Sequence, residues 1–156
     1  MQKAIKYLPA LAGILFGVAW FFWIDGHVYE NTYNRRHPDA EGPRIQWVFY
    51  LPGIFSTVGM VMANIVDLSA LSNGSFLEDG GATKVRIWLF VSFAINFGCI
   101  AAAVWIMAAL FMPPHNSISS AQWPGIAITV QNVLIFISSL LLVYKRSRND
   151  DEFQSF

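Results

Sequence analysis

The residue types that most often carry out catalysis or bind metals are scarce in this sequence. It holds three histidines and one cysteine, Cys99, which lies inside an apolar run. There is no His-Glu-x-x-His zinc motif, no Gly-x-Ser-x-Gly nucleophile motif and no phosphate-binding P-loop. All three histidines fall in polar segments that we expect to be loops, so no Ser-His-Asp set can be assembled at a shared depth. We therefore predict no catalytic residue, no metal ligand and no cofactor, and we do not expect an enzyme.

Carboxamides inside long apolar runs are the most informative polar side chains: Asn64, Asn96, Gln131 and Asn132. An unpaired amide in hydrocarbon costs several kcal/mol, so each amide is expected to find a partner. Counted at about 1.5 Å per residue from opposite faces, Asn96 and Asn132 reach a similar depth and could bond each other. We interpret the amides as interhelical hydrogen-bonding groups. The alternative is a polar site for a lipid headgroup, an ion or a partner helix.

Small and polar residues recur three and four residues apart in each apolar run, which places each set on one side of a helix. Helices in a bilayer associate through close backbone approach and interhelical hydrogen bonds, because lipid tails are as apolar as leucine. Together with the amides, these sets give the residues predicted to pack against other helices or a partner: Gly13, Gly17, Gly59, Ala63, Asn64, Asn96, Gly125, Gln131 and Asn132.

Long apolar helices are the elements that would position these side chains. The sequence is 55% hydrophobic and 13% charged, whereas soluble domains carry roughly a quarter charged residues. A helix of about 20 residues spans the ~30 Å hydrocarbon core, and apolar runs of this length or more occur at about 5–24, 45–66, 85–112 and 124–144. We predict an all-α integral membrane protein whose residues 1–156 form one domain, a bundle of four transmembrane helices.

The distribution of Lys and Arg predicts the topology of the bundle. Seven basic residues fall in the N-terminal segment, the middle connector and the C-terminal tail, and three fall in the other two connectors. The positive-inside rule then puts both termini, the connector 67–84 and the tail 145–156 in the cytosol, and the loops 25–44 and 113–123 in the lumen. Asp25 and Arg86 are expected at membrane boundaries. The sequon at Asn73 would be cytosolic and unglycosylated.

Three ordered strings of residues resemble the transmembrane protein 50 family (UPF0220). They are Phe-Trp-Ile-Asp at 22–25, Arg-Ile-Trp-Leu-Phe-Val at 86–91, and Pro-Gly-Ile-Ala at 124–127 followed by Gln-Asn at 131–132. The resemblance extends over nearly the whole chain. The longer loop after Asp25, and the lack of a cysteine-containing stretch before the first helix, suggest a fungal-type member.

The resemblance implies a non-enzymatic protein of endosomal membranes, or of Golgi, ER or vacuole membranes. For fungal members it implies a complex with vacuolar protein sorting-associated protein 55, a small tetraspanning relative of the leptin receptor overlapping transcript protein, in late endosome to vacuole transport. We therefore expect a sorting subunit whose partners are such a protein and membrane lipids. The net charge of zero gives no reason to expect nucleic acid. The alternatives are a small-solute channel or lipid-handling protein lined by the amides, or an ER membrane assembly factor.

Overall fold

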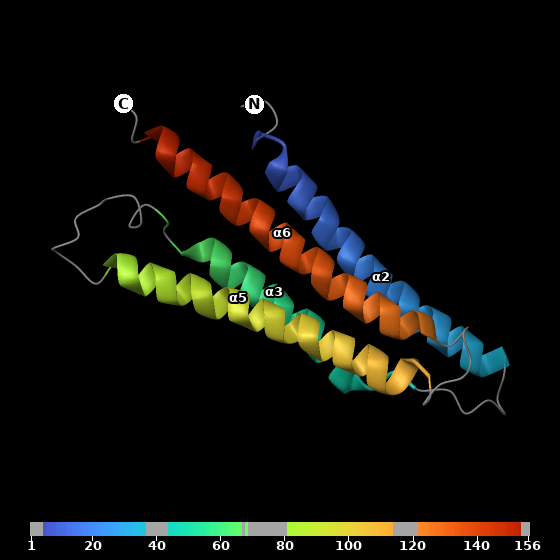
Figure 1. Ribbon diagram of the computed structural model, residues 1–156. Coiled ribbons are helices and arrows are strands. Elements are labelled where there is room, and N and C mark those ends of the chain that lie inside the picture. The colour runs from blue at the N-terminus through green and yellow to red at the C-terminus, as the bar shows by residue number, and fades with distance from the viewer. Residues whose placement is uncertain (1–4, 37–43, 67, 69–80, 114–121, 154–156) are drawn as a thin grey trace.

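The described part of the chain is helical throughout. The structure, a computed structural model, describes residues 5–36, 44–66, 68, 81–113 and 122–153. No strand occurs in these ranges. The helices are α2 (Leu8–Arg36), the 3-10 turn η1 (Trp47–Tyr50), α3 (Leu51–Ile65), α5 (Gly81–Ile106), the π-helical turn η2 (Met107–Phe111) and α6 (Trp123–Phe153) (Figure 1).

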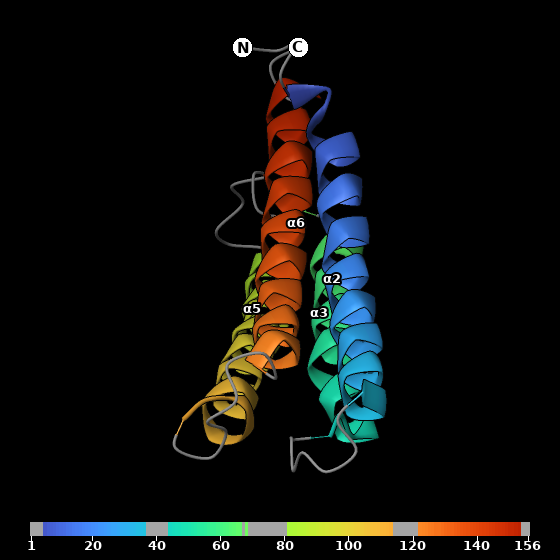
Figure 2. The ribbon, with the colours of Figure 1, turned by 90° about the vertical axis from the view of Figure 1, so that its right-hand side faces the viewer.

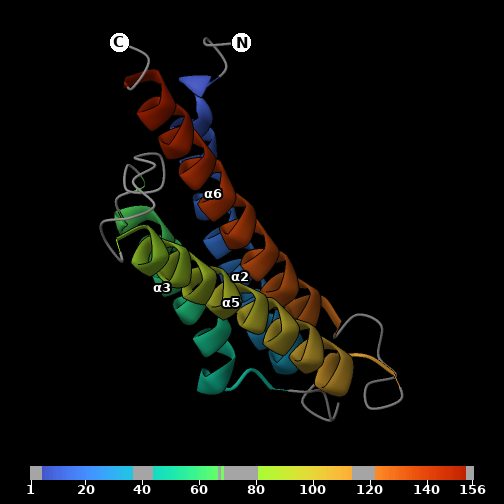
Figure 3. The same cartoon turned by 60° about the vertical axis from the view of Figure 1, so that its left-hand side comes forward.

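Four helices are long and apolar enough to cross a membrane, as predicted. They run alternately up and down, so both chain ends lie at the same end of the bundle (Figure 1). Helix α6 contacts all three of the others, and its most extensive interface is with α2 (Figure 2). Helices α3 and α5 form the second close pair (Figure 3). The chain is thus two antiparallel helix pairs joined mainly through α6.

Prolines and local hydrogen bonds explain where α3 begins and where the third span ends. Pro52 lies in the first turn of α3, where a missing N–H costs nothing. Near Pro52 the chain changes from the 3-10 turn η1 to α-helix, at Leu51. At the other helix end, Met112 is extended, with φ −108° and ψ 157°, as the residue before Pro113 must be.

Helix α2 continues twelve residues past the apolar run, through the segment expected to be a loop after Asp25. No proline interrupts the sequence between Asp25 and Arg36. Gly26 is not a break, because it is buried against α6. In the last turns the Asn34 amide donates to Glu30 Oε1 at 2.6 Å, an i, i+4 pair that supports the helix. His27, also expected in a loop, therefore lies on α2 with its ring 5.9 Å from the Tyr50 ring.

Helix α6 likewise runs on past the expected membrane end at residue 144 to Phe153. Hydropathy marks where the chain leaves lipid, but helical hydrogen bonding can continue in water when no proline or glycine intervenes. The lumenal and cytosolic assignments of the connectors remain predictions.

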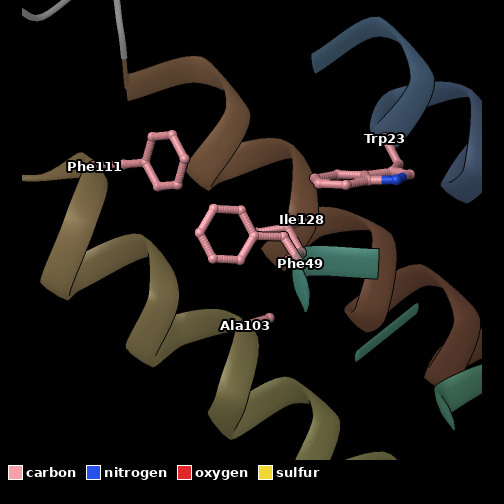
Figure 4. Packing of buried hydrophobic residues seen from close by; sticks show 5 residues of the cluster. All are labelled: Trp23, Phe49, Ala103, Phe111 and Ile128. Carbon is pink, nitrogen blue, oxygen red and sulfur yellow. The ribbon is translucent and has the colours of Figure 1, made fainter. Parts of the chain in front are cut away.

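An apolar cluster closes the end of the bundle opposite the termini. Trp23, Phe49, Ala103, Phe111 and Ile128 come from five different elements and are buried together (Figure 4). The Phe49 and Phe111 rings meet edge to face with centroids 6.1 Å apart. Elsewhere many large apolar side chains are exposed, as expected where lipid is the solvent.

Candidate functional site

The interior between α3, α5 and α6 is polar, although the surrounding surface is apolar. Seven polar side chains, all at most 1% exposed, lie inside the bundle: Ser56, Ser92, Asn96, Gln131, Asn132, Ser138 and Ser139. This arrangement places hydrogen-bonding groups where the helices meet and leaves hydrophobic groups for the bilayer. The polar interior is the candidate site, and three of the predicted amides belong to it.

Asn96 is the best-satisfied of these amides. Its Oδ1 accepts a hydrogen bond of 2.9 Å from the Ser56 hydroxyl on α3. Its Nδ2 donates to the Ser92 carbonyl on its own helix at 3.0 Å. Gly59 makes this possible, because a Cβ there would lie 2.5 Å from the Asn96 Nδ2. The predicted packing role of Gly59 therefore has a direct geometric reason.

The expected bond between Asn96 and Asn132 does not form. Asn132 Nδ2 instead donates to the Ile128 carbonyl one turn earlier on α6, at 2.8 Å. Its Oδ1 is buried without a hydrogen-bond partner among the described residues. Counting residues from the two faces of the membrane places the two amides at a similar depth. In the structure, however, the Nδ2 of each amide donates to a backbone carbonyl of its own helix.

Gln131 is the least satisfied group of the interior. It is 1% exposed, and neither its Nε2 nor its Oε1 has a hydrogen-bond partner among the described residues. The amide lies against Gly53 of α3, where a Cβ would be 2.6 Å from Nε2. Gly53 thus admits the side chain.

Asn64 lies at the end of α3 and takes part in a junction that the sequence did not reveal. Its Nδ2 donates to the Met60 carbonyl at 2.8 Å, and its backbone carbonyl accepts a hydrogen bond from Arg146 Nη1 of α6. Arg146 Nη2 donates to the Val66 carbonyl at 2.7 Å. The guanidinium therefore binds two carbonyls that the end of a helix leaves without an intrahelical donor.

The other small residues that were predicted to pack against helices fall into two groups, one buried and one exposed. Gly125 is buried at the start of α6, where a Cβ would lie 2.6 Å from the Phe111 Cβ, and Ala63 is fully buried on α3. Gly13 and Gly17 have nothing within 4 Å of a built Cβ. The face of α2 that packs on α6 carries instead Ala12, Ala19, Trp23 and Gly26. Within this chain Gly13 and Gly17 are exposed, and their binding to a partner stays a prediction.

The two predicted membrane-boundary residues have different surroundings. Asp25 is exposed, and its Oδ2 accepts a 2.8 Å hydrogen bond from Trp123 Nε1 at the start of α6. A carboxylate beside a helix N-terminus is also favoured by the helix dipole. Arg86 is exposed near the start of α5, at the end of the bundle where both chain termini lie.

A groove of about 360 Å³ lies on the outside of the bundle between α3 and α5. Its walls are apolar and include Phe55, Cys99 and Ile106, and Gly98 forms part of its floor. Among the described residues there is no group of three or more His, Cys, Asp or Glu side chains that would hold a metal ion. The histidines at 37 and 115 and the sequon at Asn73 lie outside the described residues.

Known proteins resemble the chain over nearly its full length. The model of an uncharacterised protein family (UPF0220) matches residues 2–153. A transmembrane protein 50 homolog of Dictyostelium discoideum is 69% identical over 157 aligned residues, which cover 100% of both chains.

Two fungal proteins are more distant. A UPF0220 protein of Schizosaccharomyces pombe is 28% identical, over 90% of this chain and 80% of the relative. Vacuolar protein sorting-associated protein 68 of Saccharomyces cerevisiae is 21% identical, over 90% of this chain and 81% of the relative. No solved structure gives a significant match.

Proposed function

The chain belongs to the UPF0220 family, and on that premise we propose that it is a non-enzymatic subunit of an endosomal membrane complex. Its role is to support protein transport from late endosomes to the vacuole or lysosome. The observation that carries this proposal is the similarity, over 90% of the chain, to a yeast protein named for vacuolar protein sorting. The polar interior, in which hydrogen bonds join neighbouring helices, is consistent with a subunit that binds other membrane helices.

The surface of α2 supports the proposed partner binding. Gly13 and Gly17 are one helical turn apart and exposed, with open space where a Cβ would be. A partner helix can approach such a face closely, and close approach is what drives helix association in lipid. In line with the family resemblance, the proposed partner is a small tetraspanning protein similar to vacuolar protein sorting-associated protein 55.

Affinity purification of the full chain in mild detergent, with quantitative mass spectrometry, tests the complex. We expect a second small tetraspanning protein in fixed stoichiometry. The double variant Gly13→Leu with Gly17→Leu should lose that protein while its own unfolding temperature stays the same, because neither site packs internally. The matched control is Ile14→Leu, which keeps an exposed apolar side chain on the same helix. A clean monomer from the parent chain would contradict the proposal.

A cellular assay tests the transport role separately. Cells lacking the chain are expected to secrete a soluble vacuolar or lysosomal hydrolase, and the parent chain should restore its delivery. The double glycine variant should restore it poorly if partner binding is required. Normal hydrolase delivery in cells lacking the chain would contradict a sorting role even if a complex is found.

One observation favours a second candidate, a small-solute channel or lipid-handling protein. Gln131 and Asn132 have buried amide atoms in the bundle interior that no described residue hydrogen-bonds, and such atoms would suit a polar ligand. Flux or lipid transfer by the purified chain alone in vesicles would support this candidate. Loss of that activity in Gln131→Met would assign it to the amide.

A further inference from the structure

Interhelical hydrogen bonds bring basic residues from distant parts of the chain to one level of the bundle. The Ser138 hydroxyl of α6 donates to the Ala12 carbonyl of α2 at 2.8 Å. Because the two helices are antiparallel, Lys6, about six residues before Ala12, comes level with the α6 residues near position 144. Arg146 then binds the end of α3.

A further hydrogen bond sets the level of α5. Trp88 Nε1 donates to the Met62 carbonyl of α3 at 2.8 Å, so Lys84 and Arg86 come level with the last turn of α3. The six cations that collect here, within about two helical turns, are called the basic collar: Lys6, Lys84, Arg86, Lys145, Arg146 and Arg148.

The charge of the basic collar is not neutralised by any side chain that the structure describes. Lys6, Lys84, Arg86 and Arg148 are exposed. Arg146 donates to backbone carbonyls, which carry no net charge. The acidic side chains that the structure describes, Asp25 and Glu30, both belong to the far half of α2, toward the other end of the bundle.

Residues at the opposite end of the bundle indicate the depth at which the collar lies in the membrane. Trp123 begins α6 there, and Trp47 and Trp105, each 74% exposed, belong to elements that reach the same end (Figure 1). Tryptophan is enriched at membrane interfaces. From Trp123 to Lys145, α6 rises roughly 33 Å at ~1.5 Å per residue, close to the ~30 Å hydrocarbon thickness. With Trp47, Trp105 and Trp123 at one interface, the basic collar therefore lies at the other, at headgroup level.

We propose that the basic collar is a binding site for the headgroups of anionic phospholipids. Cations that have no counter-ion among the described side chains and lie at headgroup depth attract anionic lipid, each with a strength of about 1 kcal/mol, which corresponds to roughly a fivefold change in binding. The cations of the collar come from the segment before α2 and from helices α5 and α6, so the lipid selected is the layer next to the protein in one leaflet. This inference does not depend on the sorting role.

Lipid retention by the full chain tests the site. The chain is purified from an equimolar mixture of phosphatidylcholine and phosphatidylserine in detergent, and the retained lipids are counted by native mass spectrometry. Phosphatidylserine should be enriched for the parent chain. The variant Lys84→Gln with Arg86→Gln should lower that enrichment at least about fivefold.

Two matched variants control for charge and position. Lys84→Arg with Arg86→Lys keeps both charges and should keep the enrichment, which excludes a general loss of structure. Arg35→Gln with Arg36→Gln removes two charges from the end of α2 that lies away from the collar, and should also keep the enrichment. An equal loss in this second variant would overturn the proposal.

Two further outcomes would also overturn it. The sequence has acidic residues at 67, 78, 79 and 150–152; if these neutralise the collar, the parent chain will retain both lipids equally. Inorganic phosphate at constant ionic strength should not displace phosphatidylserine. If it does, the collar is a site for the free anion instead of a lipid site.

Discussion

Asn96 and Gln131 are both buried amides, yet their contributions to stability should have opposite signs. Asn96 accepts from Ser56 and donates to a carbonyl, so its burial is compensated. Both amide atoms of Gln131 are buried without a described partner. A buried polar group that lacks its hydrogen bonds keeps the full cost of leaving water, about 1 to 3 kcal/mol. These two positions therefore allow a paired test of the polar interior.

Gln131→Met should stabilise the chain. Methionine has a similar length and an apolar end, so it fills the space beside Gly53 without leaving an unpaired donor and acceptor. We expect a gain of about 1 to 3 kcal/mol in the free energy of unfolding, measured as a higher thermal unfolding midpoint in mild detergent. A lower midpoint would mean that the amide is hydrogen-bonded, for example to a buried water molecule.

Asn96→Leu should destabilise the same bundle. The leucine removes the acceptor of Ser56 and puts a branched side chain beside Gly59. A loss of about 1 to 2 kcal/mol is expected, the usual contribution of an interhelical hydrogen bond in a membrane protein. The measurement is the same unfolding midpoint, with Gln131→Met as the companion. An unchanged midpoint would show that the Asn96 pairing is not stabilising.

Of the four amides in the apolar runs, Asn96, Gln131 and Asn132 are buried and Asn64 is half-buried, but the sequence did not predict which of them are hydrogen-bonded. Burial follows from an amide's place inside an apolar run with small neighbours, and the pattern around Asn96 and Asn132 shows both. Pairing depends on rotamers and on the rotation of each helix about its axis, to within a fraction of a turn. That is why the possible Asn96–Asn132 bond does not form, and why the room that Gly53 makes for Gln131 was not predicted.

At the scale of the element, α3 is the helix whose end depends most on a neighbour. Its last residue, Ile65, is followed by extended Val66, with ψ 140°. Arg146 of α6 donates to two of them. A cation at a helix C-terminus is also favoured by the dipole. The end of α3 is thus set by a residue about 80 positions later in the chain.

Arg146→Gln should loosen the end of α3. The shorter amide cannot reach two carbonyls at once, so one or both lose their donor. We expect faster amide hydrogen exchange in the last turn of α3 and a loss of about 1 kcal/mol in the free energy of unfolding. Arg148→Gln is the control, because Arg148 is exposed and binds no carbonyl of α3 in the described structure. Equal effects of the two changes would contradict the capping role.

Sequence patterns located the four helices but not all of their ends. The third span ends just before Pro113, as its predicted end at 112 implied, because the effect of proline is local. The second span was predicted from residue 45, whereas its α-helix begins only at Leu51, after a 3-10 turn. The polar continuation of α2 to Arg36 was missed, since hydropathy reports the solvent around a helix and not its hydrogen bonding. Arg146 contributed only to the prediction of membrane topology. Its contact with α3 joins segments that are far apart in the sequence, and a local sequence pattern does not reveal such a contact.

At the scale of the whole molecule, the two ends of the bundle carry different types of residues. One end has the basic collar and both termini; the other has the apolar cluster, exposed tryptophans and the extension of α2. With four alternating helices, the placement of one end fixes the compartment of every connector. The positive-inside rule favours the collar as the cytosolic end, and a single accessibility experiment decides between the two orientations.

Cysteine labelling in intact organelles is that experiment. Cys99 is first replaced by serine, since it is 8% exposed and is the chain's one cysteine. Ser147→Cys on the C-terminal part of α6 and Thr32→Cys on the extension of α2 then introduce exposed thiols near opposite ends of the bundle. A membrane-impermeant maleimide added from the cytosolic side should label position 147 at once and position 32 only after the membrane is permeabilised.

The reverse labelling pattern would put the basic collar in the lumen. The anionic headgroups that the collar is proposed to bind are concentrated in cytoplasmic leaflets, so the reverse pattern would leave the site in a leaflet poor in its ligand. The lipid-retention experiment in detergent would give the same result in either orientation. Agreement between the two experiments is therefore needed before the collar can be assigned a role in the cell: one measures the chemistry of the site, and the other measures which leaflet it faces.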